Sequence, residues 1–347
     1  MWNSTTLRRI NLKRPSEVAD VRRFLERFGL SFDTVVDYTV ALYREDAIVA
    51  TGSLAGEVLR NFAVDETLQG EGLTATVISE LMREAAARGV YHYFIYTRPQ
   101  KAHLFASLGF AEIARAEPFA ALLESGLGSV QQYCGDLQRQ TSCLPLENRA
   151  AIVMNGNPFT LGHLALVRTA ASQSNLILFV VSEDRSLIPF ADRFRLIRQG
   201  VEDLPNVVVV PGGKYLISAA TFPGYFTKGA ESTAAQTRLD ATLFASRIAP
   251  ALGIKRRYVG EEPYCEVTAA YNKAMADIFP AYGLQLQVMA RAEADGEVIS
   301  ASKVRAAIRR DDWSAVAELV PATTLSYLRS EQAQPVIEQI KTSDSRH

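Results

Sequence analysis

A histidine at the start of a predicted helix, preceded by asparagine and glycine residues, is the part of this chain best suited to phosphate chemistry. The nine residues Asn155–His163 read Asn-Gly-Asn-Pro-Phe-Thr-Leu-Gly-His. They follow a short apolar run, residues 150–154, and lead into the apolar-periodic run 164–170, so the pattern predicts strand, turn and helix. In that context backbone N–H groups can hold phosphate, and His163 would donate to a phosphoryl oxygen as charge builds in the transition state.

Further side chains of this segment add hydrogen-bonding groups. Asn155 and Asn157 offer amides to phosphate or to an incoming nucleophile, Thr160 offers a hydroxyl, and Pro158 stiffens the turn. A lone histidine is more often structural than catalytic. Here, however, the complete segment lies between a predicted strand and a predicted helix, which favours a role in phosphate chemistry for His163.

A second motif lies about 140 residues downstream, in Ile299-Ser300-Ala301-Ser302-Lys303-Val304-Arg305. Ser300 and Ser302 are good caps for a helix from Lys303 onward, and their hydroxyls and the free N–H groups would face phosphates. Arg305 would pair with the developing negative charge. Alone, this pattern is an ordinary serine-capped surface helix, but beside the first motif it indicates a second part of one site.

Two more segments border the expected site. Residues 259–264, Val-Gly-Glu-Glu-Pro-Tyr, end a strand at the edge where parallel sheets bind ligands. Gly260 and Glu261 are the candidate ligand-binding residues of this segment. An equal alternative for Glu261 and Glu262 is that they are ordinary negative charges at a helix N-terminus.

The segment 211–226 is rich in aromatic, glycine and proline residues. Lys214 is a candidate ligand for phosphate or carboxylate, and a buried hydrophobic crossover is the alternative for the segment. Its aromatic side chains would wall a small acyl pocket: Tyr215, Phe222, Tyr225 and Phe226. Arg185 and Arg193 would either form solvated ion pairs or steer a triphosphate, and the ion pairs are the default expectation.

A glycine-containing loop stands out in the N-terminal part of the chain. Gln69, Gly70 and Gly72 lie between a predicted strand, 58–64, and a predicted helix, 76–88. Glycines let consecutive N–H groups face a pyrophosphate at a helix N-terminus. A turn without a ligand is the alternative.

The surrounding pattern predicts an α/β protein of two domains. Residues 1–135 combine helices, among them one capped by Ser16, with strands at 38–43, 48–54, 58–64 and 91–97, which predicts an α+β domain. Residues 136–148 are expected to be a linker, 149–330 the second domain and 331–347 a tail. Apolar strands alternating with helices predict a parallel sheet in the second domain. Its strands are expected at 150–154, 176–182, 206–210, 256–260 and 284–290, and its helices at 161–173, 191–203, 232–250, 265–279 and 302–310.

Composition narrows the class of protein further. The 347 residues carry a formal net charge of −1, which gives no electrostatic argument for a nucleic-acid partner. Three cysteines at irregular spacing predict neither a disulfide framework nor a metal site. No apolar run approaches the ~20 residues of a membrane span, and the basic N-terminus lacks the apolar core of a signal peptide. We therefore expect a cytoplasmic enzyme that does not associate with membranes.

The two phosphate motifs resemble those of the nucleotidyltransferase superfamily. Thr160-Leu161-Gly162-His163 is similar to its (His/Thr)-x-Gly-His signature, and residues 299–305 to its Ile-Ser-x-Ser-x-x-(Arg/Lys) signature. Such enzymes attack the α-phosphate of a nucleoside triphosphate and release pyrophosphate. The resemblance implies catalytic roles for His163, Thr160, Lys214 and Arg305. It implies an ATP site made by Asn155, Gly156, Asn157, Phe159, Thr160, Gly162, His163, Gly260, Glu261, Ser300, Ser302 and Arg305.

The N-terminal part resembles the GNAT-type acetyltransferases. Residues 69–74, Gln-Gly-Glu-Gly-Leu-Thr, look like their pyrophosphate-binding loop, and Ser107-Leu108-Gly109-Phe110 is similar to a later signature. Thr74 departs from the glycine or alanine usual there and adds bulk near the phosphate path. The resemblance therefore implies binding of a pyrophosphate more firmly than acetyl transfer.

The two parts in this order resemble the citrate lyase ligase family, as do three segments: Asn155–His163, 212–226, and 259–264 with Thr268, Tyr271 and Asn272. The resemblance implies an acid–thiol ligase that uses ATP and Mg²⁺ to activate acetate as acetyl-adenylate. It would then acetylate the CoA-like prosthetic thiol of the citrate lyase acyl carrier (gamma) subunit, release AMP and activate the lyase. Gln69, Gly70 and Gly72 would hold the prosthetic arm.

Two alternatives remain open from the sequence. One is an adenylyltransferase that acts on a phosphorylated small molecule such as phosphopantetheine. The other is a GNAT-type acetyltransferase whose second domain senses nucleotide.

Overall fold

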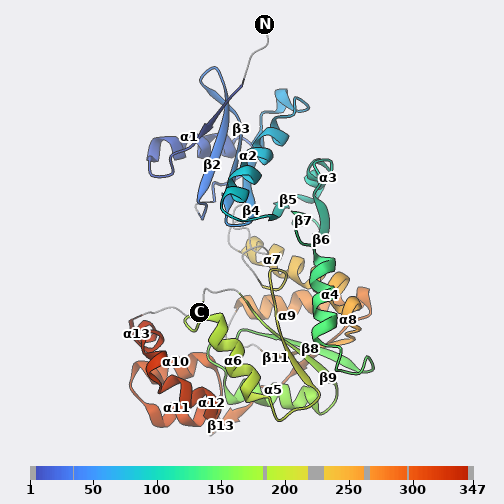
Figure 1. The fold of residues 1–347 in the computed structure, drawn as a ribbon, viewed down its shortest axis with the longest axis vertical. Helices are drawn as coiled ribbons and strands as arrows, with labels where there is room; N and C mark the ends of the chain where they lie inside the picture. The colour runs from blue at the N-terminus through green and yellow to red at the C-terminus, as the bar shows by residue number, and fades with distance from the viewer. Residues whose placement is uncertain are drawn as a thin grey trace. The chain divides into compact units, whose positions relative to one another are not determined.

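The computed structural model describes residues 5–33, 35–182, 186–217, 230–261, 266–294 and 297–342. The chain divides into two compact units (Figure 1). The first comprises residues 1–132 and 220–243, and the second comprises residues 133–219 and 244–347. Among the described residues, no helix combines the length and the apolar character that crossing a bilayer requires.

The first unit is built on a mixed sheet of seven strands in the order β1-β2-β3-β4-β5-β7-β6. β4 and β5 pair in parallel and the other neighbours are antiparallel. The strands are β1 (Thr6–Arg9), β2 (Tyr38–Arg44), β3 (Ala47–Ala55), β4 (Val58–Val64), β5 (His92–Thr97), β6 (Ala111–Ala116) and β7 (Ala120–Gly126). The helices are α1 (Pro15–Glu26), α2 (Leu73–Ala87), α3 (Ala102–Ala106) and α7 (Ala230–Leu243), with 3-10 turns η1 (Glu66–Leu68) and η2 (Pro99–Lys101).

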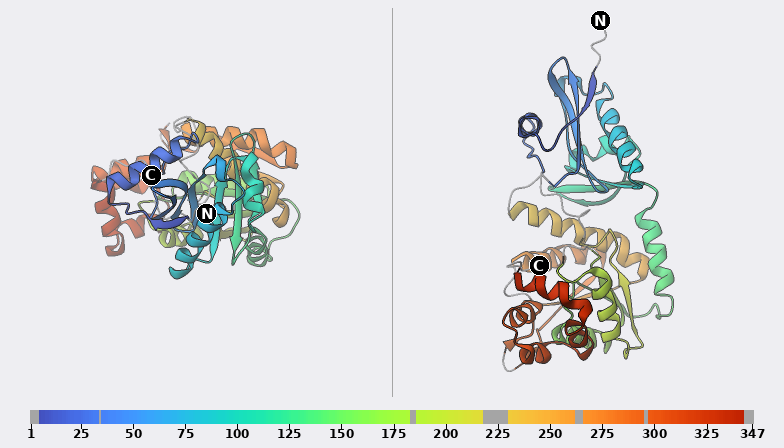
Figure 2. Two further views of the ribbon diagram at one scale, coloured as in Figure 1. Left: turned by 90° about the horizontal axis from the view of Figure 1, so that it is seen from above. Right: turned by 60° about the vertical axis from the view of Figure 1, so that its left-hand side comes forward.

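Alternation along the strands gives this sheet two apolar faces. On β2, Val40 and Leu42 belong to the cluster that contains the apolar residues of α2, whereas Ala41 belongs to the cluster that contains those of α1. Successive strand residues point to opposite faces, so α1 and α2 cover opposite sides of the sheet (Figure 2). α7 packs against β6 and β7.

The second unit contains a five-stranded sheet in the order β10-β9-β8-β11-β12, and every neighbouring pair is parallel. The strands are β8 (Arg149–Met154), β9 (Asn175–Val180), β10 (Val207–Pro211), β11 (Arg256–Gly260) and β12 (Gln285–Met289). A two-stranded ribbon joins β13 (Glu293–Ala294) to β14 (Glu297–Val298). The helices around the sheet are α5 (Leu161–Ala171), α6 (Phe190–Gly200), α8 (Ala249–Leu252) and α9 (Glu266–Ile278), with a π-helical turn η4 (Phe244–Ile248) and a 3-10 turn η5 (Phe279–Tyr282).

The strand order reverses at β8, whose neighbours are β9 on one side and β11 on the other. Ligands of open α/β sheets bind outside the carboxyl ends of the strands at such a reversal. The loop that begins at Asn155 leaves the carboxyl end of β8, and Glu261 follows the end of β11. The topology therefore places both predicted segments at one edge of the sheet.

Four C-terminal helices pack around a buried cluster that also includes Leu187, Ile188 and Leu196 of α6 and the loop before it. They are α10 (Ala301–Arg309), α11 (Trp313–Leu319), α12 (Ala322–Leu328) and α13 (Gln334–Thr342), with a 3-10 turn η6 (Glu331–Ala333) before α13 (Figure 1). Val304, Val316, Leu328 and Ile337 meet in one buried cluster. Residues 331–342 of the expected tail are thus helical, and α13 contributes to the core.

The segment between the two predicted domains is held in place by hydrogen bonds. α4 (Val130–Gln140) occupies its first part, and the Gln138 side chain donates to the carbonyl of Ala251. The buried guanidinium of Arg149 donates to the carbonyls of Thr141, Leu144, Pro145 and Leu252. Residues 136–148, predicted as a linker, are thereby tied to the second unit.

The predicted fold class, an α+β part followed by a parallel sheet with helices, is confirmed by the two sheets. All five strands of the second sheet fall within two residues of their predicted positions. The predicted cap at Ser16 is wrong, because α1 begins at Pro15, which suits the first helical turn. The long helix predicted at 232–250 is three pieces, α7, η4 and α8, and Pro250 opens the last of them.

Candidate active site

The centre of the site is a reciprocal pair of hydrogen bonds between Thr160 and His163 at the start of α5. The backbone N–H of His163 donates to Thr160 Oγ1 (3.2 Å), and the backbone N–H of Thr160 donates to His163 Nδ1 (3.1 Å). The hydroxyl of Thr160 lies 2.8 Å from the same ring nitrogen. This capping box satisfies N–H groups that helix formation leaves unpaired and fixes the imidazole ring.

These contacts define which ring nitrogen carries the proton. A backbone N–H can only donate, so Nδ1 of His163 must accept and must be unprotonated. The neutral ring therefore has its proton on Nε2, which makes Nε2–H a hydrogen-bond donor. Thr160, predicted to donate to phosphate, instead uses its hydroxyl to orient His163.

The electrostatics of the site keep this ring neutral. Burial lowers the pKa of His163 to about 4, and the positive charge of Arg291 acts in the same direction. At neutral pH the ring is uncharged and retains the Nε2 proton.

Phe159 supports His163 from the core side. Its ring is fully buried and stacks on the imidazole with 5.9 Å between centroids and 15° between planes. Beneath it, a β-carbon at Gly200 would lie 2.6 Å from the Phe159 ring, so only glycine fits there without a shift. The side chain of Phe159, which was predicted to line an ATP site, thus packs beneath the His163 ring.

The two predicted phosphate motifs meet in the structure. A β-carbon at Gly162 would lie 2.9 Å from the carbonyl oxygen of Ile299, so the start of α5 lies against the second motif. Buried Arg305 reaches back from α10 and donates through Nη1 to the carbonyl of Asn157 at 2.6 Å. Burial lowers the pKa of the Arg305 guanidinium from its ordinary value. Arg305 therefore links the loop before α5 to α10 by a hydrogen bond. Its remaining N–H groups can bind other acceptors.

Of the two serines predicted to cap the helix of the second motif, Ser300 does so, whereas α10 begins at Ala301 and Ser302 lies within its first turn. Ser300 is the N-cap residue and accepts from the backbone N–H of Lys303, and its hydroxyl lies 2.9 Å from that of Ser302. Ser302 is exposed. Two helices of nine or more residues, α5 and α10, thus begin near the junction of the motifs, and helix N-termini attract negative charge.

Asparagine side chains of the first motif are engaged by the loop before α6. Asn155 exchanges hydrogen bonds with Ser186, and its Oδ1 also accepts from Arg193 Nη1 at 2.8 Å. Asn157 Oδ1 accepts from the backbone N–H of Ile188. Asn157 Nδ2 is buried without a hydrogen-bond partner in the described part of the chain. The hydrogen bonds of the two side-chain amides therefore hold the loop after β8 against the residues before α6.

Arg193 corrects the sequence-based interpretation. It is fully buried and donates to the carbonyls of Asn155, Val181 and Ile188. The expectation of a solvated ion pair is wrong, because the guanidinium serves three backbone carbonyls in place of water. Its residue type suggests the surface, although its position, three residues after Phe190 and four before Ile197, lies on the apolar face of α6.

At the end of β11 the predicted Gly260 and Glu261 are held by their backbones. The Gly260 carbonyl accepts from the Asn272 side chain at 3.1 Å, and the Glu261 carbonyl accepts from Arg291 Nε at 2.5 Å. The charge of Arg291 is also felt by His163. Sequence reasoning missed Arg291, although its place two residues beyond β12, at the carboxyl edge of the sheet, was a usable signal.

Lys214 lies farther along the same edge. It is exposed in the turn after β10, two strands from β8, and buried Tyr215 precedes the end of the described stretch. The turn is fixed where Tyr133 donates to the carbonyls of Pro211 and Gly212. Lys214 stays a predicted ligand, and the other predicted residues outside the description are Arg185, Phe222, Tyr225, Phe226 and Glu262–Tyr264.

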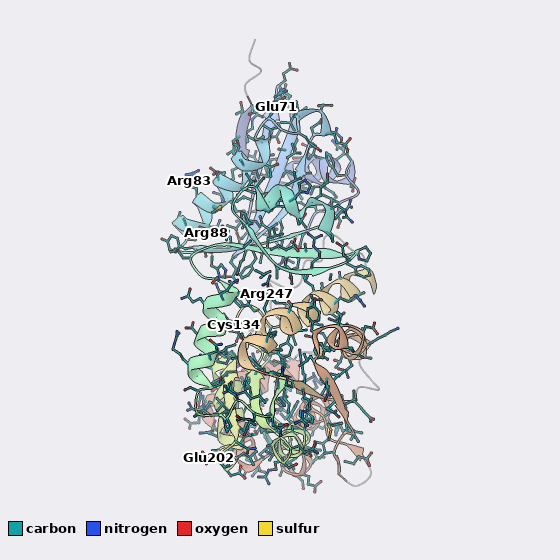
Figure 3. The ribbon with its side chains drawn as sticks, turned by 90° about the vertical axis from the view of Figure 1, so that its right-hand side faces the viewer. Glu71, Arg83, Arg88, Cys134, Glu202 and Arg247 are labelled. Carbon is teal, nitrogen blue, oxygen red and sulfur yellow. The ribbon has the colours of Figure 1, made fainter. Side chains whose placement is uncertain are left out.

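The loop of the first unit is open to solvent. Gln69, Gly70 and Gly72 are exposed, and the two glycines have φ of +93° and +78°. Gly72 precedes α2 and no side chain caps that helix. Glu71 extends from this loop and pairs with Arg44, while Arg83 and Arg88 stand farther along α2 (Figure 3). The backbone N–H groups at the start of α2 could bind an anion, and a pyrophosphate at this loop stays a prediction.

Comparison with solved structures gives partial matches to acyltransferases. A putative acyl-CoA N-acyltransferase from Klebsiella pneumoniae is 14% identical and aligns 36% of this chain with 99% of that chain, at a TM-score of 0.31. The ribosomal-protein-S18-alanine N-acetyltransferase from Escherichia coli is 18% identical over 36% of this chain and 96% of that chain, also at 0.31.

Comparison with known sequences covers nearly the whole chain. The profile of the citrate lyase ligase C-terminal domain matches residues 149–328. The citrate (pro-3S)-lyase ligase of Klebsiella pneumoniae is 42% identical over 89% of this chain and 91% of its own length. That of Escherichia coli K12 is 36% identical over 95% of both chains. With the two phosphate motifs joined at one sheet edge, these likenesses show that the chain belongs to the citrate lyase ligase family.

Proposed function

We propose that this chain is an acid–thiol ligase that activates acetate with ATP and acetylates the prosthetic thiol of a citrate lyase acyl carrier subunit. The coarse part, a citrate lyase ligase, follows from family membership. Three steps lie beyond it: formation of acetyl-adenylate, release of pyrophosphate, and transfer to the CoA-like arm. The observation that carries them is the junction of the two phosphate motifs around a neutral His163.

In the first step a carboxylate oxygen of acetate forms a bond to the α-phosphorus of ATP. The bond from that phosphorus to the oxygen bridging to the β-phosphate breaks, and pyrophosphate leaves. Such displacement depends on positioning and on stabilisation of oxygen charge. Nε2–H of His163 donates to an α-phosphoryl oxygen, and the N-termini of α5 and α10 with Arg291 hold the triphosphate.

Mg²⁺ would be bound mainly through the substrate. No group of three His, Cys, Asp or Glu side chains fit for a metal occurs in the portion of the chain that the structure describes. Mg²⁺ usually keeps several waters and binds through phosphates with one or two carboxylates. An ion bound in that way would supply charge neutralisation to the phosphates.

In the second step the prosthetic thiol, as thiolate, attacks the acetyl carbon and AMP departs. The arm carries phosphopantetheine and a pyrophosphate, and the exposed loop of Gln69, Gly70 and Gly72 offers backbone donors to such a group. We infer that this loop holds the arm during transfer. The first unit would then act as a binding module for the carrier's arm.

The test is acetate-dependent exchange of labelled pyrophosphate into ATP. The wild type is expected to exchange only with acetate present, and His163→Ala is expected to lower the rate by about 10²–10³-fold, as loss of one transition-state donor does. His103→Ala, an exposed histidine of the first unit, is the matched control and should exchange normally. Exchange that ignores acetate, or a fully active His163→Ala variant, would exclude acyl-adenylate chemistry at this site.

A further inference from the structure

Arg257, on the central part of β11, is a buried arginine with side-chain N–H groups that lack an acceptor among the described residues. Its residue exposure is 2%, and neither Nε nor Nη1 has a hydrogen-bond partner within the described portion of the chain. Burying a charge costs free energy unless the charge is paired and hydrogen-bonded. Arg149, the buried arginine at the start of β8, shows the usual solution, since it donates to four carbonyls.

Aromatic rings flank the Arg257 guanidinium. Its central carbon lies 4.6 Å from the ring centre of Phe244 and 5.4 Å from that of Tyr271. The Phe244 ring in turn contacts Phe179 and Phe279. Such cation–π contacts stabilise a desolvated guanidinium. They act on the faces of the guanidinium and leave its in-plane N–H donors without acceptors.

The missing partner is best supplied by an anion. A carboxylate matches the planar fork of a guanidinium with two parallel hydrogen bonds. The aromatic rings around the site would accept a short aliphatic group but offer little to a highly charged phosphate. Both features together fit a small monocarboxylate.

The position of Arg257 on the sheet suits an acid that attacks ATP. Tyr258 packs in the cluster that contains Val167 and Ala170 of α5, so Arg257 faces the opposite side of the sheet. Arg257 pairs in register with Ala151 of β8, about 10 Å before the carboxyl edge at Gly260. Arg257 therefore lies below the carboxyl edge of the sheet, on the face opposite α5.

This placement agrees with the geometry of the reaction. Attacking and leaving oxygens lie roughly in line across the phosphorus in such transfers. The helix N-termini that would hold the departing pyrophosphate, those of α5 and α10, lie together where Gly162 meets Ile299. An acid that approaches from the Arg257 face would reach the α-phosphorus from the opposite side.

We propose that Arg257 binds the carboxylate of the acid substrate, a short-chain monocarboxylate, and that Phe244 and Tyr271 enclose its hydrocarbon end. This assignment rests on the proposed function, because it names the residue that recognises the acid in the same reaction. It makes Arg257 a specificity-determining residue that was absent from the sequence-based candidates.

The first experiment compares Arg257→Met and Arg257→Lys in the pyrophosphate exchange assay with acetate and ATP varied separately. We expect Arg257→Met to raise KM for acetate at least tenfold while KM for ATP changes less than twofold. Arg257→Lys, which keeps the charge and loses the fork, should fall between wild type and Arg257→Met. Lys255 is exposed and lies just before β11. Lys255→Met is therefore the control and should leave both KM values unchanged.

A second variant keeps the proposal testable if Arg257→Met does not fold. Phe244→Leu removes part of the apolar wall, so we expect the ratio of kcat/KM for propionate over acetate to rise at least fivefold. An unchanged acetate KM in folded Arg257 variants, or an unchanged acid preference in Phe244→Leu, would overturn the assignment.

Failure of this inference is distinguishable from failure of the proposed function. A wild type that shows no acetate-dependent exchange would count against acetyl-adenylate formation itself. In that case the thermal midpoint is measured with and without acetate and without ATP. A rise in Tm with acetate in the wild type, absent in Arg257→Lys, supports the carboxylate site. No rise in the wild type overturns it.

Discussion

Among individual residues, His163 matters most to the proposed chemistry, because its Nε2 proton is the donor to phosphate. Thr160 binds Nδ1 from two directions, Phe159 stacks on the ring, and the Nε2 proton remains for a phosphoryl oxygen. A neutral histidine donates a hydrogen bond to the phosphoryl oxygen without adding a positive charge. Such a charge would stabilise the bound ATP and the transition state to a similar extent and so would not speed the reaction. Thr160 is in these terms a positioning residue.

The lowered pKa of His163 predicts a specific dependence of stability on pH. The folded ring protonates only near pH 4, whereas the unfolded ring protonates near pH 6.5. Between these values the unfolded state binds more protons, so the free energy of unfolding falls as pH decreases from 6.5 to 4. His163→Gln should lose this part of the pH dependence, measured as urea unfolding at pH 7 and pH 5.

The control is His103→Gln, an exposed histidine that should retain the wild-type difference between the two pH values. Equal falls in stability for His163→Gln and wild type would show that His163 does not titrate in this way.

At the scale of elements, the site depends on the close approach of the starts of α5 and α10. Gly162 lies within α5 and meets the backbone of Ile299, and Arg305 of α10 binds the carbonyl of Asn157. A backbone carbonyl cannot move aside as a side-chain tip can. The absence of a β-carbon at Gly162 is therefore a condition for the two motifs to share a ligand.

Gly162→Ala should destabilise the protein, although alanine is normally the better helix residue. The added methyl would meet the Ile299 carbonyl at 2.9 Å, and overpacking of this kind costs about 1–3 kcal/mol. We expect a lower free energy of unfolding and a raised KM for ATP. Gly135→Ala in α4 is the matched control, because the added β-carbon would meet only Arg139, at 3.9 Å. This substitution should raise the free energy of unfolding by about 0.5–1 kcal/mol.

The sequence predicted the parts of this site that rest on local pattern. Strand, loop and helix around residues 150–170 follow from apolar spacing, and the cap at Ser300 from its residue type. The roles of Arg193 and Arg257 could not be predicted, because long-range packing alone decides whether an arginine serves carbonyls, meets aromatic rings or faces water. Arg291 was missed for a similar reason, since its proximity to His163 requires the register of β12 beside β11.

At the scale of the whole molecule, each unit contains its own candidate anion-binding loop. The second unit has the junction of α5 and α10, and the first has the exposed residues before α2. In the proposed function these serve different substrates, ATP and the prosthetic arm. Their contributions should therefore be separable by substitutions within the full chain.

Gly72→Asp should block transfer while sparing activation. Aspartate tolerates the positive φ of this position, but its carboxylate would occupy the N–H groups at the start of α2 and repel a pyrophosphate. We expect normal acetate-dependent pyrophosphate exchange and at least a tenfold higher KM for the carrier subunit. Gly72→Asn has the same shape without the charge and should affect KM less. Equal transfer by the wild type and Gly72→Asp would remove the loop from the arm site.

The first unit is discontinuous along the chain, since residues 220–243 belong with residues 1–132. During synthesis on the ribosome, β6 and β7 would emerge long before α7, the helix that packs on them. The N-terminal sheet would await its last helix while most of the parallel sheet was being made. A fragment cut after residue 135 would lack a native segment, and its remainder would carry that segment without its partner strands. The first unit would therefore be completed only once the chain has passed residue 243, when β8, β9 and β10 of the second unit have already been made.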